Sequence, residues 1–196
     1  MKPPASLALL AVALGAAVAA GVAPSTDKSH KLQSVSLRKM ADCLHAVIAA
    51  DRAVYSRVIV ERLALEKSKM AVGEDYQAAD CLPVHAQMLR LAARGIQQKG
   101  AEFSYTLRSL WPINPSQGPQ TEIEREGLEA VARTPGTNFY REELLGGRSY
   151  FTAIYADRAT SPSCVDCHNR HASSPRSDFR TNEVMGAIVI RIPLEF

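Results

Sequence analysis

The sequence predicts an α+β fold, with helices in the first half of the chain and an antiparallel sheet in the second half. Two observations support this prediction. From about His30 to Lys67, apolar side chains recur at close to helical spacing, and no Gly or Pro interrupts them. After Gly100 the pattern changes to alternating and β-branched runs, which are typical of strands.

The first 23 residues have the layout of a secretory signal peptide, with an approximate cleavage site. Lys2 carries one positive charge, a mostly apolar run extends from Ala5 to Leu14, and small residues follow it. This run is shorter than the ~20 apolar residues that a membrane-spanning helix needs. We therefore expect cleavage rather than an uncleaved membrane anchor. The mature protein is expected to be exported, to the periplasm or a similar compartment, with no membrane attachment.

In the mature chain we expect a long N-terminal helix and, after it, one folded domain. The N-terminal helical segment is assigned to residues 24–75, and Gly73 marks a break near its end. The remaining domain is assigned to residues 76–196. Its first helix is expected from about Pro83 to Gln98, with Pro83 in the first turn, where a missing amide costs least.

Strands and one capped helix are expected after Gly100. The run "AEFSYTLRSL" alternates as a strand does. The segment "QTEIEREGLEAVAR" predicts an amphipathic helix that Thr121 opens, with Glu124 three residues later in a capping-box pattern. The segment "NFYREELLGGRSYFTAIYADR" predicts a hairpin that turns at Gly146 and Gly147, and "GAIVIRIPLEF" predicts a final strand.

The charge pattern argues against nucleic acid as a partner. The formal net charge is +3, and the 23 basic residues are scattered among 20 acidic ones rather than clustered. No pair of carboxylates and no Ser/His/Asp arrangement suggests hydrolytic or acid–base chemistry. Enzyme activity is therefore the less favoured interpretation.

The stretch "SPSCVDCHNRH" contains a Cys-x-x-Cys-His motif formed by Cys164, Cys167 and His168. This is the spacing of c-type haem attachment, in which two thiols form thioether bonds and the histidine is an axial ligand of the iron. Pro162 and the polar residues after the motif predict a loop or a single helical turn. The motif predicts one covalently bound haem c, with His168 as the proximal ligand.

A redox-active dithiol and half of a zinc site are the alternative uses of such a cysteine pair. A zinc site needs a second closely spaced pair of ligands, and the histidines outside the motif form no such pair. A thioredoxin-like dithiol lies between a strand and a helix in a βαβ pattern, which the sequence lacks. Haem attachment also agrees with the export signal.

The ligand on the other side of the iron stays open from the residues alone. Cys43 and His45 lie two apart on the expected helix, so their side chains cannot point at the same centre. Cys43 and Cys81 could instead form a disulfide, which is common in exported proteins. The candidates are Cys43, Cys81, His45, His85, His171 and several methionines.

Three segments together resemble a family of bacterial c-type haem domains that was long catalogued as a domain of unknown function. They are "LWPINPSQGPQTEIEREGLEAV", "GRSYFTAIYADRATSPSCVDCHN" and "MGAIVIRIPLEF". The resemblance covers roughly Cys81 to Phe196. It implies a PAS-like fold, in which helices flank an antiparallel sheet and a long helix precedes it. It also implies a periplasmic haem domain that is free-standing or a sensor module.

The resemblance further implies a distal ligand. Some members hold haem between a histidine and a cysteine, and the segment "DCLPVHAQM" is similar to the one that supplies this cysteine. The resemblance thus favours Cys81 as the distal ligand of the metal, with His85 and Cys43 as alternatives. A Cys43–Cys81 disulfide would remove that thiolate.

Three functions are expected in order of preference. The first is a periplasmic monohaem c-type cytochrome that senses redox state or binds a diatomic gas such as NO or CO. The second is an electron-transfer cytochrome c. The third is a mono-haem oxidase of small nitrogen compounds, although no lysine follows Lys99. The expected partner is a small diatomic ligand or a redox partner protein, and a homo- or heterodimer through the N-terminal helix is a further expectation.

Overall fold

The structure is a computed structural model that describes residues 35–67 and 70–195. The predicted signal peptide over residues 1–23 lies outside this described part. Within the described part, no helix is both long enough and apolar enough to cross a membrane. The elements that follow belong to one unit of the chain, which begins at Val35.

The predicted N-terminal helix consists of α1, Leu37–Val54, and the π-helical segment η1, Tyr55–Glu66. Ser36 caps its start, because the Ser36 hydroxyl oxygen accepts a hydrogen bond from the Lys39 backbone amide at 3.2 Å. The prediction of a long helix is confirmed over these residues, and its part before residue 35 lies outside the described residues. The wider π winding of the second part is not predicted by the spacing of apolar residues.

A short parallel strand pair precedes the second helix. It consists of β1, Ala71–Gly73, and β2, Cys81–Pro83, and it leads into α2, His85–Gln98. The expected position of Pro83 in the first helical turn is wrong, because Pro83 is the last residue of β2. A proline suits a short edge strand, where an amide donor is not needed. The Tyr55 hydroxyl donates to the Pro83 carbonyl oxygen at 2.7 Å and fixes the chain just before α2.

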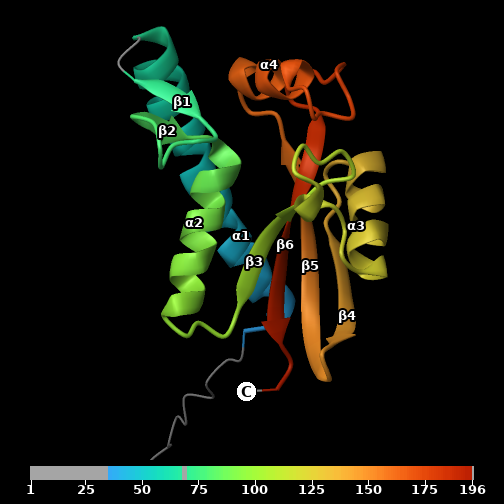
Figure 1. Cartoon of the computed structure of the whole chain (residues 1–196). Coiled ribbons are helices and arrows are strands. Elements are labelled where there is room, and N and C mark those ends of the chain that lie inside the picture. Colours follow the sequence, from blue (N-terminus) through green and yellow to red (C-terminus); the bar gives the residue numbers. More distant parts are fainter. Residues whose placement is uncertain (1–34, 68–69, 196) are drawn as a thin grey trace, which may run out of the picture. The chain divides into compact units, whose positions relative to one another are not determined.

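A four-stranded antiparallel sheet forms the second half of the fold, with the spatial order β3-β6-β5-β4. Its strands are β3, Ser104–Arg108; β4, Phe139–Leu145; β5, Arg148–Arg158; and β6, Val184–Pro193. β6 is the last strand in sequence and lies between β3 and β5 (Figure 1). The predicted hairpin is confirmed as β4 and β5. Its turn residues Gly146 and Gly147 have φ values of 58° and 83°, as a type I′ turn requires.

Helices cover both faces of this sheet (Figure 1). α1 and α2 pack on one face, where Ile188 and Ile190 of β6 are buried. α3, Glu122–Arg133, packs on the other face, where its Leu128 contacts the core that contains Val189 of β6. Successive side chains of β6 therefore enter opposite cores. The predicted α+β, PAS-like fold, an antiparallel sheet with flanking helices and a long N-terminal helix, is confirmed.

Part of α1 exposes apolar side chains. Met40, Val47 and Val54 are exposed at seven-residue intervals, and Cys43 is exposed on the same helix. Apolar residues at this interval line one stripe of a helix, as they do where two helices pack in a coiled coil. The expected dimer through the N-terminal helix stays a prediction. This stripe is an exposed apolar surface through which such a dimer could form.

The predicted capping box at the start of α3 is confirmed in a modified form. The Thr121 hydroxyl oxygen accepts from the Glu124 amide at 3.1 Å, and the Glu124 carboxylate accepts from the Gln120 amide at 2.6 Å, one residue earlier than the pattern predicts. Burial would raise the pKa of Glu124, but the Gln120 amide and the guanidinium groups of Arg191 and Arg108 hold it below its usual value. The carboxylate is thus ionised and ties α3 to the sheet.

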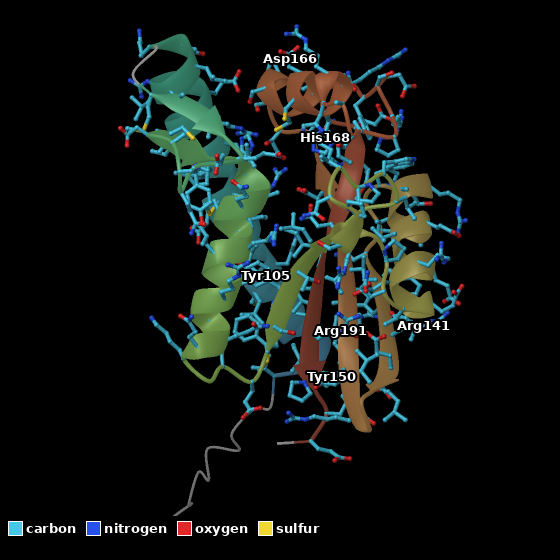
Figure 2. All side chains as sticks on the ribbon, viewed as in Figure 1. Tyr105, Arg141, Tyr150, Asp166, His168 and Arg191 are labelled. Carbon is cyan, nitrogen blue, oxygen red and sulfur yellow. The ribbon has the colours of Figure 1, made fainter. Side chains whose placement is uncertain are left out.

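Arg191 of β6 bridges two buried carboxylates. Its guanidinium lies 2.8 Å from Glu124 of α3 and 2.7 Å from Glu143 of β4. The Thr152 hydroxyl donates to the same Glu143 oxygen at 2.6 Å. Figure 2 shows Arg191 among the strands of the sheet. One side chain therefore compensates two charges that burial would otherwise make costly.

Replacement of Arg191 by alanine is expected to lower the free energy of unfolding by about 3–5 kcal/mol, because it removes the ion pair of buried Glu143 and leaves buried Glu124 with Arg108 alone. Urea denaturation measures this loss. Arg133→Ala is the matched control, since it removes an exposed ion pair with Glu129 and should cost less than about 1 kcal/mol. Equal losses in the two variants would contradict the role assigned to the buried bridge.

Candidate functional site

The Cys-x-x-Cys-His motif lies on α4, Pro162–Arg170, a helix of 9 residues. The expected loop or single turn is wrong. Pro162 occupies the first helical position, where the fixed φ and missing amide of proline are compatible with a helix. Because residues three and four apart share one side of a helix, Cys164, Cys167 and His168 lie on the same side of α4.

Hydrogen bonds fix both ends of α4. Near its start, the Ser163 hydroxyl donates to the Glu61 carboxylate of η1 at 2.6 Å. Near its end, the Asn169 side chain exchanges two hydrogen bonds with the Phe179 backbone, each 2.9 Å long. Cys164 is buried in a small apolar cluster that also contains Phe179. The helix that bears the two thiols therefore has a fixed position against η1 and the following loop.

A cavity of about 910 Å³ lies against α4. Its volume falls within the roughly 300–1,000 Å³ that is usual for small-molecule and cofactor sites. Its walls come from α1, η1, β1, α2, β3, the loop after β3, β5, α4 and β6. Cys164, Cys167 and His168 all line it, and Figure 2 shows His168 on the side of α4 that faces the strands.

Apolar and cationic side chains share the cavity wall. Val60 of η1, Leu107 of β3 and Trp111 of the following loop contribute apolar surface. Arg90 of α2 also lines the cavity and forms no ion pair with any residue that the structure describes. The wall thus combines apolar surface with a cation that is free to bind an anionic group.

A β-bulge shapes the cavity at the start of β6. The register between β5 and β6 shifts after Asp157 and leaves Met185 as the extra residue. Met185 and Gly186 line the cavity. A Cβ atom on Gly186 would lie 2.6 Å from the Arg108 carbonyl oxygen, so only glycine allows β3 and β6 to approach this closely here.

Two imidazoles line the cavity from different helices, His168 of α4 and His85 at the start of α2. His168 Nδ1 and His85 Nε2 are buried and have no hydrogen-bond partner among the described residues. Burial, helped by Arg52 and His168 and opposed by Glu61, lowers the pKa of His85 to about 4. Burial is also the main cause that lowers the pKa of His168. Both rings are neutral at neutral pH, which is the form that binds metal ions.

The motif thiols lack the features of a redox-active pair. Partial desolvation raises the pKa of Cys167, and Glu74, Cys164 and Asp166 raise it further, whereas reactive cysteine pairs have a lowered pKa. Within residues 35–67 and 70–195, no group of three or more His, Cys, Asp or Glu side chains is placed to hold a metal ion. The arrangement supports neither the dithiol nor the zinc alternative.

The two other predicted cysteines are not part of the cavity wall. Cys81 is half-buried in β2, and its Sγ would lie 3.3 Å from a Cβ placed on Gly73 of the neighbouring strand. Cys43 is exposed on α1, and neither cysteine is in a disulfide. The structure therefore does not bring Cys81 or Cys43 to the motif.

His45 has a structural environment of its own. Its ring stacks on the Tyr155 ring, with 4.0 Å between centroids and 6° between planes, and it does not line the cavity. Of the predicted candidates for the distal ligand, the structure thus brings His85, His171 and Met185 to one wall with His168 and the two motif cysteines.

Sequence reasoning missed two charged residues of the cavity wall. Arg52 of α1 lies 3.1 Å from the Asp157 carboxylate of β5 and donates to the Thr160 hydroxyl at 3.2 Å. Burial raises the pKa of Asp157, and Arg52 opposes that rise. A signal existed in the sequence, because Arg52 occupies a position four residues after Ile48 on the apolar face of the helix, and a charge there needs a partner.

The fold and the cavity define a PAS-like α+β domain with a cofactor-sized cavity beside a Cys-x-x-Cys-His helix. A family model described as Tll0287-like matches residues 30–193, so the chain belongs to the Tll0287-like family. The match spans both the N-terminal helix and the segment that follows it.

Comparison with solved structures finds a similar fold in the crystal structure of the cyanobacterial heme-protein Tll0287. The TM-score is 0.50, the sequence identity is 16%, and the alignment covers 82% of this chain and 98% of that chain. At this identity the likeness shows the fold. Comparison with curated proteins finds no match.

Replacement of Arg52 by alanine is expected to cost about 3–5 kcal/mol of stability at neutral pH, because the buried Asp157 loses its partner. Without Arg52, burial raises the pKa of folded Asp157 further above the ordinary value of 3.8. The loss of stability is therefore fully present above the pKa of Asp157 in the folded variant. It shrinks as the pH falls toward the pKa of Asp157 in the unfolded chain. Urea denaturation across acid and neutral pH measures it.

The double variant Arg52→Ala with Asp157→Asn is the control for this experiment. It removes the unpaired charge and should recover part of the stability at neutral pH while showing little pH dependence. A loss in Arg52→Ala that is the same at every pH would contradict the assignment.

Proposed function

We propose that this chain binds one haem c in the cavity beside α4. The observation that carries the proposal is the placement of Cys164, Cys167 and His168 on one side of α4 and on the wall of a single cavity. The similar solved structure is named a heme-protein, and the chain belongs to the family named after it, which supports the same ligand class.

The residues of the cavity fit a haem. A porphyrin is a large, mostly apolar group with a central iron and two carboxylates. The cavity offers apolar surface from Val60, Leu107 and Trp111, neutral imidazoles at His85 and His168, and Arg90, which has no ion-pair partner among the described residues. The buried His85 Nε2 has no other partner in the described structure, as expected for a ring nitrogen with a role in binding a ligand.

The motif residues would hold the haem covalently. Each thiol, of Cys164 and of Cys167, would add across one vinyl group, so that one C–S bond forms and the thiol proton passes to the neighbouring vinyl carbon. His168 would donate a ring nitrogen to the iron as the proximal ligand. The bound haem supplies reversible one-electron chemistry and exchange of axial ligands.

The proposed location is the periplasm or another exported compartment. The signal-peptide layout of the first 23 residues supports it, as does the use of a c-type attachment motif.

Sensing of redox state or of a diatomic gas is the proposed role of the haem. Its support is that the cavity is linked to the N-terminal helix at two points. Arg52 of α1 is paired with Asp157 and Thr160, and Glu61 of η1 accepts from Ser163 of α4. A ligand change that displaces α4 would act on both α1 and η1. The exposed apolar stripe of α1 is available to a partner protein.

Electron transfer is the second candidate function. Cys167 is exposed, so a haem attached through it would have one edge near the protein surface. An exposed edge allows electrons to pass to a partner without a conformational change. No arrangement of described residues favours the oxidase expectation.

Replacement of Cys164 and Cys167 together by serine is expected to abolish covalently bound haem in protein produced with an export signal and haem-attachment machinery. Serine hydroxyls do not form the thioether bonds that survive denaturation. Haem staining of a denaturing gel and the intact mass measure the loss. Cys43→Ser is the matched control and should keep its haem, because Cys43 is exposed and away from the cavity. Haem that remains attached in the double variant would contradict the proposal.

A further inference from the structure

We infer that His85 is the second axial ligand of the haem iron, so that the haem lies between His85 of α2 and His168 of α4. The inference rests on the proposed haem site and names the residue that completes it. It assigns the role to a side chain on the cavity wall, in place of Cys81, which the family resemblance favours.

The hydrogen bonding of the cavity wall supports this assignment. Among the described residues that line the cavity, the side chains with a buried polar atom that lacks a partner are His85, Gln87 and His168. Leaving such an atom unpaired costs about 1–3 kcal/mol. Imidazole is the ligand type among these three that suits iron. Coordination through Nε2 would give the buried His85 nitrogen the partner that the described residues do not provide.

His85 is held in place by its neighbours. The Tyr55 ring meets the His85 ring edge-on, with 6.1 Å between centroids and 89° between planes. The Tyr55 hydroxyl also donates to the Pro83 carbonyl oxygen at 2.7 Å, two residues before His85. His85 is the first residue of α2, which gives its backbone a fixed direction. A ligand held by rigid elements loses little conformational freedom when it binds.

Cys81 is less suited to the role in this structure. It lies in β2, which pairs with β1, and its sulfur packs toward Gly73 rather than onto the cavity wall. For Cys81 to reach the iron, the β1–β2 pair would have to move or open. His85 needs no such change, since it already lines the cavity.

Two other residues of the wall are engaged elsewhere. His171 Nδ1 accepts from the Ser173 amide at 3.1 Å, and His171 Nε2 lies 3.5 Å from the Glu74 carboxylate. Met185 is buried in the apolar cluster that contains Cys164, beside the helix that bears the proximal ligand. His85 is thus the ligand candidate of the described wall that comes from another helix and has no competing partner.

The consequence for function is that no coordination position stays open. With imidazoles on both sides of the iron, NO or CO has to displace His85 before it can bind. Gas binding would then report on the mobility of the start of α2, and electron transfer would proceed with both ligands in place.

Electron paramagnetic resonance and near-infrared magnetic circular dichroism of the ferric wild-type holoprotein test the inference first. We expect a low-spin signal with bis-imidazole character, which these methods distinguish from imidazole–thiolate and imidazole–thioether ligation without any mutation. Haem staining after denaturation is measured on the same samples, so that attachment and ligation are scored separately.

Variants then assign the ligand. His85→Gly should keep its covalent haem, lose the low-spin signal, and regain it when imidazole is added. CO should bind the ferrous variant at least about tenfold more tightly than the wild type, because His85 no longer competes for the iron. Cys81→Ser and Met185→Leu are the matched controls and should leave the wild-type signal unchanged.

Three results would overturn the inference. A thiolate signature lost in Cys81→Ser would assign the role to Cys81, and a thioether signature lost in Met185→Leu would assign it to Met185. A high-spin wild type that His85→Gly does not change would leave the position open. In all three the haem stays attached, so the proposed haem site survives. Wild-type protein without covalent haem would instead overturn the haem site and, with it, this inference.

Discussion

The structure depends on the burial of β6 on both faces. This strand pairs with β3 on one edge and β5 on the other, and its side chains alternate between the core under α1 and α2 and the core under α3. A slip of one residue in its register would exchange the two cores. It would also carry Arg191 away from Glu124 and move Met185 and Gly186 out of the cavity wall. The position of the candidate site is therefore set by a strand that bears neither the motif residues nor His85 nor Cys81.

The cavity is assembled from elements that are distant in sequence and are joined by few polar contacts. The N-terminal helix reaches the far end of β5 through Arg52 and Asp157, and it reaches α4 through Glu61 and Ser163. These contacts are short and partly or fully shielded from solvent, so they respond together when one element moves. Sensing, the first function proposed for the haem, would use this joint movement, whereas electron transfer would not need it.

Local sequence patterns predicted those parts of the fold that local physics decides. Gly146 and Gly147 predicted the hairpin because only such a pair adopts the required φ values readily, and Thr121 predicted a helix start because its hydroxyl caps the amides that follow. The helical form of α4 could not be predicted, since a proline marks a loop and a first helical turn equally well. The choice between Cys81 and His85 depends on which side chain faces a cavity built by eight helices and strands, and no spacing rule contains that information.

The place of the central strand in the chain has a consequence for how the protein matures. β3 has no strand partner until β6 has been made, and the thiols of α4 precede β6 in sequence. Pairing between distant segments is slow compared with the formation of a short helix or a hairpin. On a chain that emerges from its N-terminus, the cysteines of α4 are accessible before the sheet can close. The proposed covalent attachment and final folding would thus be kinetic competitors, and the order in which they finish would determine whether the haem is enclosed.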